Sequence, residues 1–177
     1  MNRNGFRKIV LSGLFVFGVS LILFPIIGEM ITHKKQREEI ASMKENILGE
    51  LKIPSIDVDL PIYKGVDEEL LEIGVGHVEG TNLPGEGKGT QCLLAGHRGL
   101  PRARLLARLG EVRNGDVFFV TMGGETYQYH VCMIRVIKPD DTEEFMKNNK
   151  QELVSIITCT PYGINTHRLV VTGERIH

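Results

Sequence analysis

Residues 153–171 read LVSIITCTPYGINTHRLVV, two apolar runs with a turn between them. The first run ends at Cys159 and the second begins at Arg168. Pro161 and Gly163 lie between the runs, and proline and glycine are residues that commonly turn a chain. The stretch therefore predicts two β-strands joined by a short loop, with a thiol where the first strand ends.

Further short apolar runs recur between turn signals on the N-terminal side of this stretch. Residues 117–120 are followed by Gly123 and Gly124 and then by alternating residues at 127–131, which is the pattern of a β-hairpin. The expected strands are 49–53, 56–61, 91–95, 116–122, 125–138, 152–159 and 168–176, with brief helices at 68–73 and 101–109. Many short strands with few helices favour a mainly β fold, either a sandwich or a closed barrel.

The composition excludes several classes of protein. The 177 residues include 21 Lys+Arg against 22 Asp+Glu, and this balance argues against a nucleic-acid partner. An apolar content of 42% excludes a disordered chain, and the length suffices for a core without disulfides. Because the chain has 3 cysteines, at least one thiol stays outside any disulfide framework within the chain.

The N-terminal part predicts a membrane anchor. Residues 9–27 contain no charged side chain. A helix of this length spans roughly 28 Å, close to the roughly 30 Å of a bilayer core. A cleaved signal peptide is the alternative, and it too would send the chain to or across a membrane. We expect a cytoplasmic segment at 1–8, a transmembrane anchor at 9–28, a helical stalk at 29–50 and one folded domain at 51–177.

Cys159 is the thiol that could carry chemistry. A cysteine at the mouth of a strand, beside a turn, can face a cleft, whereas Cys92 and Cys132 lie inside apolar strands and are expected to be inert. The alternative is that Cys159, like Cys92 and Cys132, is a small buried side chain without a chemical role. A thiol acts as a nucleophile only as the thiolate, so it needs a nearby base or positive charge.

Two histidines and one arginine could supply that help. His97 lies where an expected strand gives way to a turn, and His167 lies on the loop that follows Cys159. Spacing alone does not choose between the two rings. Arg168 opens the last expected strand, where its guanidinium could stabilise an oxyanion, although a surface arginine is the alternative.

Three motifs resemble the signatures of a known enzyme family. Residues 158–168 read TCTPYGINTHR, residues 77–84 read HVEGTNLP and residues 96–101 read GHRGLP. Together they are similar to the signature segments of sortases, most closely those of the class C, or pilin-polymerising, branch. The resemblance covers about residues 51–176. It implies a closed β-barrel of about eight strands with short helices, preceded by one N-terminal transmembrane helix.

The resemblance also implies roles for individual residues. Cys159 matches the nucleophile of the family, His97 the catalytic histidine and Arg168 the catalytic arginine. The candidate substrate-binding residues in the same motifs are Thr158, Thr160, Asn165 and His77. No cofactor or metal is implied. The sequence offers no evident carboxylate partner for His97, so we do not propose a catalytic triad.

The activity implied is that of an extracellular cysteine transpeptidase held in the cell membrane by a single pass. Such enzymes of Gram-positive bacteria cleave a sorting signal similar to Leu-Pro-x-Thr-Gly after threonine, through a thioester. Class C members transfer the acyl group to a lysine of a pilin subunit. The alternatives are a sortase that serves a cell-wall precursor, a cysteine hydrolase, and a catalytically idle binding module.

Two features of class C enzymes are missing from the sequence. There is no Asp-Pro dipeptide of the lid motif, so we expect an open cleft. The chain ends at His177 without a second apolar helix, so we expect anchoring through residues 9–27. The basic stretch that follows His97 is expected to be a solvated face; it contains Arg98, Arg102, Arg104 and Arg108.

Overall fold

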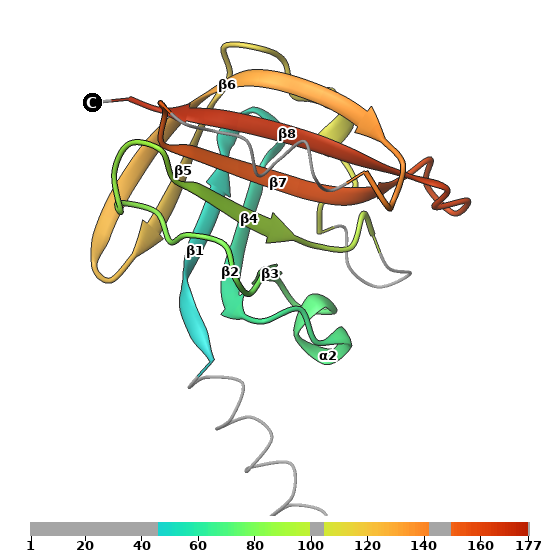
Figure 1. The fold of residues 1–177 in the computed structure, drawn as a ribbon. Coiled ribbons are helices and arrows are strands. Elements are labelled where there is room, and N and C mark those ends of the chain that lie inside the picture. Colours follow the sequence, from blue (N-terminus) through green and yellow to red (C-terminus); the bar gives the residue numbers. More distant parts are fainter. Residues whose placement is uncertain (1–45, 100–104, 142–149, 177) are drawn as a thin grey trace, which may run out of the picture. The chain divides into compact units, whose positions relative to one another are not determined.

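Eight β-strands close on themselves to form one barrel (Figure 1). The computed structural model describes residues 46–99, 105–141 and 150–176. Around the barrel the strands follow the order β1-β2-β3-β4-β7-β8-β6-β5. This confirms the predicted mainly β, closed-barrel fold of about eight strands.

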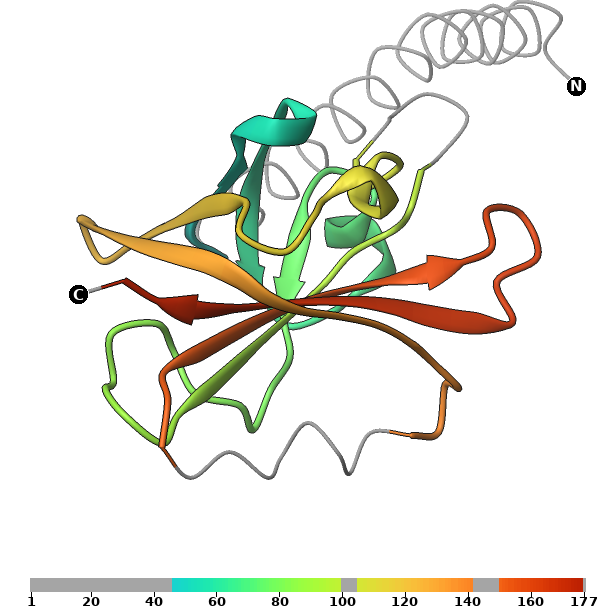
Figure 2. The same ribbon diagram turned by 90° about the horizontal axis from the view of Figure 1, so that it is seen from above.

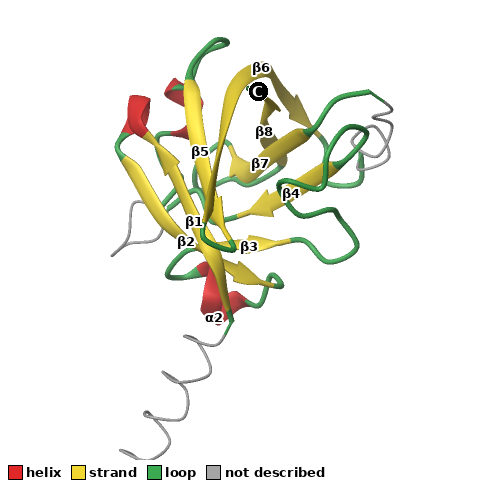
Figure 3. Ribbon diagram, turned by 90° about the vertical axis from the view of Figure 1, so that its left-hand side faces the viewer, coloured by secondary structure: helices red, strands yellow, loops and turns green. Residues whose placement is uncertain are grey.

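The strands carry most of the regular structure. They are β1 (Ile47–Ile53), β2 (Val58–Lys64), β3 (Val75–His77), β4 (Gln91–Ala95), β5 (Val117–Met122), β6 (Glu125–Ile137), β7 (Leu153–Thr160) and β8 (His167–Arg175). The helical segments among the described residues are short (Figure 3): helix α2 (Glu68–Leu71) and 3-10 turns at Pro54–Ile56 and Leu109–Glu111.

The β5–β6 hairpin forms where the sequence predicts it. Met122 lies opposite Glu125, so Gly123 and Gly124 make a two-residue turn. Both glycines have positive φ values, 61° and 84°. The hairpin turns that match the twist of the flanking strands require such values, which glycine adopts without steric cost.

Strand β3 is the element that the sequence does not predict. It pairs in parallel with β2 and antiparallel with β4, where a loop was expected. A Cβ at Gly76 would overlap the backbone carbonyl oxygen of Gly65, so this close approach requires glycine. Glycine is depleted in strands, and a strand of three residues offers too little alternation to be recognised.

Alternate side chains of strand β7 face the inside and the outside of the barrel. Val154 and Ile156 belong to the main core, together with residues such as Leu51 and Phe118 from the other strands. Ile157 instead packs in a second apolar cluster with Leu93 and Val170. Since side chains alternate along a strand, Cys159 lies on the same outer face as Ile157.

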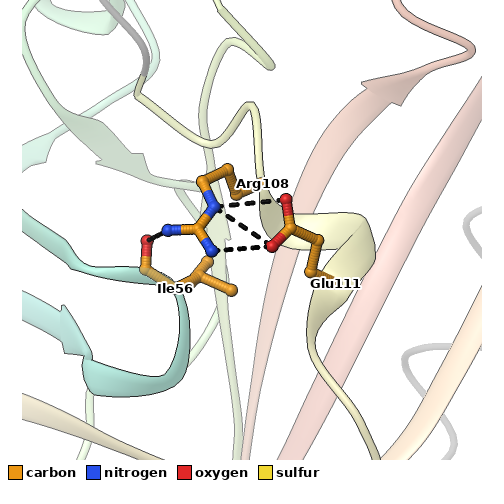
Figure 4. A network of polar contacts seen from close by, with 3 residues as sticks. All are labelled: Ile56, Arg108 and Glu111. Atoms are coloured by element: carbon orange, nitrogen blue, oxygen red, sulfur yellow. Dashed lines mark hydrogen bonds and ion pairs between the residues drawn. The ribbon is translucent and has the colours of Figure 1, made fainter.

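Arg108 joins two parts of the fold (Figure 4). Its Nη1 donates a hydrogen bond to the carbonyl oxygen of Ile56 at 3.2 Å. Its Nη2 donates to a carboxylate oxygen of Glu111 at 2.7 Å. The guanidinium thus ties the 3-10 turn after β1 to the one before β5, so Arg108 has a structural role within the basic stretch.

Several sequence-based expectations lie outside the described residues. The expected anchor at 9–28 does so entirely, and so do residues 29–45 of the expected stalk; residues 47–50, expected at the end of that helical stalk, instead lie in strand β1. β1 begins at Ile47, ahead of the expected start of the domain at Leu51. Within the described part of the chain, no helix has the length and apolar character needed to cross a bilayer.

Candidate active site

The parallel pairing of β4 and β7 brings the ends of two distant segments together. Ala95 lies opposite Ile157, and the backbone N–H of Gly96 donates to the carbonyl oxygen of Ile157 at 3.0 Å. Both strands run in the same direction, so their C-terminal ends reach the same edge of the barrel. Two residues beyond the Ala95–Ile157 pair, the two segments reach His97 and Cys159.

A small pocket lies at this edge and contains both residues. Its lining consists of His97, Arg98, Gly99, Cys159, Tyr162, Gly163 and Asn165. The volume is about 170 Å³. Small-molecule pockets measure roughly 300 Å³ or more, so this pocket suits part of an extended chain better than an enclosed small molecule. Of the two histidines that spacing left open, His97 is the one beside the thiol.

Arg168 lies next to this pocket on strand β8. It is directly opposite Cys159 in the antiparallel β7–β8 pair, and directly opposite residues project from the same face of a sheet. Its Nη1 donates to the backbone carbonyl oxygens of Asn165 at 3.2 Å and of His167 at 3.1 Å. The β7–β8 connection therefore holds the guanidinium at the outer face that carries the thiol.

The four candidate substrate-binding residues fall into different surroundings. Asn165 lines the pocket with a φ of 61°, and Thr160 accepts a hydrogen bond from Nη1 of Arg98. Thr158 is buried, at 2% exposure. The ring of His77 is also buried, with Nε2 at 3.1 Å from both the Asn82 carbonyl oxygen and the Thr81 hydroxyl. Only Asn165 and Thr160 thus lie at the pocket or bonded to its lining.

Arg98 is a pocket residue that the sequence reading missed. The expectation of a solvated face is wrong for this residue, because its side chain lines the pocket and bonds to Thr160. The available signal was its position directly after His97, at the end of a buried strand. Its guanidinium thus adds a positive charge to the pocket that contains Cys159.

Glu68 is a second missed residue, and it gives His97 a carboxylate neighbour that was not evident from the sequence. Its Oε1 lies 3.4 Å from Nε2 of His97. Glu68 is the first residue of helix α2, which follows β2, whereas His97 follows β4. The β2–β3 and β3–β4 pairings join these segments (Figure 2), and no local sequence pattern reports such a contact.

The other two thiols have surroundings unlike those of Cys159. Cys92 lies in the core, and burial raises its pKa to about 12, with a smaller contribution from Glu86. Cys132 is exposed, against the expectation of a side chain inside an apolar strand, but partial burial of its sulfur and the charge of Glu174 raise its pKa. Both environments disfavour the thiolate, so Cys159 is the thiol best suited to act as a nucleophile.

Comparison with known proteins assigns this arrangement to a family. The sortase domain family matches residues 51–176, nearly all of the described barrel. The chain belongs to the sortase family. Sortases are cysteine transpeptidases. Sortases in general act on sorting-signal substrates and amine acceptors.

Curated sortases share moderate identity with the chain. Sortase D of Bacillus subtilis is 30% identical over 131 residues, which cover 72% of this chain and 63% of that protein. Sortase A of Bacillus anthracis is 25% identical over 208 residues, which cover 99% of this chain and 97% of that protein. The chain thus spans less than two thirds of the length of the Bacillus subtilis relative.

Solved sortase structures share the fold and more of the sequence. Group B Streptococcus Pilus Island 1 Sortase C2 matches with a TM-score of 0.72 and 47% identity over 75% of each chain. Sortase C-1 from Actinomyces oris matches with the same TM-score, identity and coverage. Identity at this level extends the likeness beyond the fold itself.

Proposed function

We propose that this sortase is an extracellular, membrane-anchored enzyme of class C. It cleaves a Leu-Pro-x-Thr-Gly-like sorting signal after threonine and transfers the acyl group to a lysine of a pilin subunit. The observation that carries the proposal is that Cys159 and His97 line one pocket. Arg168 stands directly opposite Cys159 on the neighbouring strand.

The reaction begins with acylation of the thiol. The Cys159 thiolate adds to the threonine carbonyl carbon, and the carbonyl oxygen becomes an oxyanion. When this intermediate collapses, the bond from threonine to the glycine nitrogen breaks. His97, in its protonated form, gives its proton to that leaving nitrogen, and the acyl group remains on sulfur as a thioester.

The second half of the reaction returns the enzyme to its starting state. The neutral acceptor amine adds to the thioester carbonyl carbon, and His97 takes the proton from its nitrogen. The carbon–sulfur bond then breaks, which releases an amide and regenerates the thiolate. One imidazole serves in both directions because the second half mirrors the first.

Arg168 fits the role of stabilising the oxyanion. A positive group aimed at the place where negative charge develops lowers the barrier in a water-poor site. The two backbone carbonyl oxygens that accept from Nη1 fix the plane of its guanidinium. The remaining N–H groups of this planar fork can then face the substrate without further reorganisation.

Pilin polymerisation is favoured over cell-wall anchoring by the solved structures. The Group B Streptococcus neighbour with 47% identity is named for a pilus island. The curated relatives named Sortase A and Sortase D are 30% identical or less. The pilin role predicts a protein lysine as the second substrate, whereas a wall-anchoring enzyme would use a precursor amine.

The membrane anchor is part of the same proposal. It rests on the uncharged run at 9–27, which matches the thickness of a bilayer core. An enzyme that joins surface subunits needs its catalytic domain outside the cell and close to the membrane. Accessibility of the domain to protease added to intact cells, with cell lysis as the control, tests this arrangement.

The first experiment measures the intact mass of the protein after mixing it with Leu-Pro-x-Thr-Gly peptides. We expect an adduct equal to the peptide up to threonine, absent from Cys159→Ala and present in Cys132→Ala. Adding a lysine-bearing pilin should then remove the adduct and yield a joined product. Release of free acid despite abundant amine would favour a hydrolase, and an adduct on Cys159→Ala would contradict the mechanism.

A further inference from the structure

The carboxylate of Glu68 is the acidic group that meets the ring of His97. Oε1 of Glu68 lies 3.4 Å from Nε2 of His97. The Glu68 side chain is 81% exposed, so its carboxylate stays hydrated. The His97 side chain is only 26% exposed. A charged, solvated group therefore touches a ring that is largely withdrawn from solvent.

Nε2 of His97 needs a partner of this kind. The atom is buried from solvent, and within the described residues it makes no hydrogen bond. A buried N–H without an acceptor is destabilising, because it has lost its hydrogen bonds to water. The oxygen of Glu68 already lies within ion-pair distance, so a small rotation of its exposed side chain aligns the bond.

Helix α2 holds Glu68 at this position. The backbone N–H groups of Leu70 and Leu71 both donate to the carbonyl oxygen of Asp67, which fixes the first turn. Leu70 is buried. Leu71 packs so closely on β3 that a Cβ added to Gly76 would lie 3.1 Å from the Leu71 side chain. The backbone that carries Glu68 is thus packed on the barrel, although its carboxylate reaches outward.

We propose that Glu68 is a positioning residue for His97. Its carboxylate accepts the Nε2–H of the imidazole, which leaves Nδ1 as the nitrogen available to Cys159 and to the substrate amine. This inference rests on the proposed role of His97 as acid and base. It adds a carboxylate to the three residues implied by the family resemblance, and it assigns the two ring nitrogens different tasks.

The proposal predicts a graded effect of substitution. Glu68→Ala removes both the acceptor and the charge, whereas Glu68→Gln keeps an oxygen that can accept the same hydrogen bond. General acid–base catalysis contributes about 10²- to 10⁴-fold, and a positioning group supplies part of it. We expect Glu68→Ala to lower kcat by about 10-fold or more with little change in KM, and Glu68→Gln to recover part of the loss.

The experiment uses the full chain in detergent, with ¹⁵N introduced only at histidine and His97→Gln to assign the ring signals. The nitrogen shifts of wild type should report protonated Nε2 and unprotonated Nδ1 when the ring is neutral. Glu68→Ala should change this distribution, and Glu68→Gln should keep most of it. Glu69→Ala is the matched control, an exposed carboxylate on the same helix, and should behave as wild type.

The two proposals fail in different ways. Wild-type kcat together with unchanged His97 shifts in Glu68→Ala would overturn the role of Glu68. If no peptide acylates the wild-type protein, the proposed function fails, and the ring shifts still decide whether Glu68 sets the tautomer. Thermal unfolding of each variant separates these outcomes from loss of the fold, which an exposed carboxylate is not expected to cause.

Discussion

At the residue scale, the surroundings of the three thiols decide which of them can react. Cys92 lies in the core with its pKa raised to about 12, so at pH 8 only about one molecule in 10⁴ carries its thiolate. The pKa of Cys132 is raised as well, mainly by burial. Cys159 instead lines an open pocket beside His97 and Arg98. The reactivity of each thiol thus follows from its surroundings.

This difference predicts selective alkylation. A small alkylating agent at pH 8 should label Cys159 first, Cys132 more slowly and Cys92 only after unfolding. Labelling of Cys132 should rise with pH, because its raised pKa means that more alkaline solution is needed to form the thiolate. Peptide mapping by mass spectrometry gives the three rates. Equal labelling of all three in the folded protein would contradict the assignment.

A second residue-scale prediction concerns the guanidinium opposite the thiol. Arg168→Lys keeps the charge but cannot reproduce the planar fork that now bonds to the Asn165 and His167 carbonyl oxygens. Loss of an oxyanion donor costs about 10²- to 10³-fold in rate. We expect single-turnover acylation by a sorting peptide to fall by this factor.

The control for this substitution is Arg113→Lys, since Arg113 is an exposed arginine outside the lining of the pocket. Alkylation of Cys159 by a small reagent should change much less than acylation, because that reaction develops no oxyanion. An acylation rate for Arg168→Lys equal to that of wild type would remove Arg168 from the mechanism.

At the element scale, a network of polar contacts around Glu152 lies at the end of the barrel opposite the pocket that contains Cys159. Glu152, directly before β7, is 5% exposed and accepts hydrogen bonds from the Tyr129 hydroxyl and the Gly85 backbone N–H, each at 2.9 Å. The guanidinium of Arg175 lies 4.3 Å from the centre of the Tyr127 ring. The β7–β8 connection marks the other end of these strands (Figure 1).

Glu152→Ala should therefore lower stability without lowering catalysis. The change leaves the buried Tyr129 hydroxyl without its acceptor and also removes the hydrogen bond from the Gly85 N–H, which together cost about 2–4 kcal/mol in the free energy of unfolding. Tyr129→Phe removes one hydrogen bond from the same network and should cost about 1 kcal/mol. Urea unfolding measures both changes.

Acylation by a sorting peptide provides the control, measured well below the unfolding transition. It should stay near the wild-type rate, because a strand of this length keeps Glu152 about 20 Å from Cys159. A large loss of acylation in a folded Glu152→Ala protein would mean that the two ends of the barrel are coupled.

Individual elements also show how much of the fold and of the site could be predicted from the sequence. Strands β5 and β6 were predictable because their apolar runs flank a pair of glycines, and β7 because its apolar run ends at a turn. β3 was not predictable, because its close packing requires glycine at position 76, and glycine is not a residue that indicates a strand. Cys159 and His97 were found by their motifs, whereas Glu68 reaches His97 only through the strand pairings.

At the scale of the whole molecule, the barrel is complete without the residues that precede β1. Pairing of β1 with β5 closes the sheet, and residues from Asn46 to His177 form one compact unit. The absence of an Asp-Pro dipeptide predicts that no lid of the class C type plugs the pocket. The residues that would form such a lid lie mostly outside the described part of the chain.

An open pocket predicts equal reactivity in two shortened proteins. One begins at residue 33 and the other at residue 46, and both contain the whole barrel. If residues 33–45 do not cover the pocket, Cys159 should be alkylated, and acylated by a sorting peptide, at the same rate in both within about twofold. A lid that must open would lower the apparent rate in the longer protein by the fraction of time it is closed. Acceleration of 10-fold or more on removing residues 33–45, with unchanged unfolding of the barrel, would therefore establish a lid of a different sequence type and contradict the prediction.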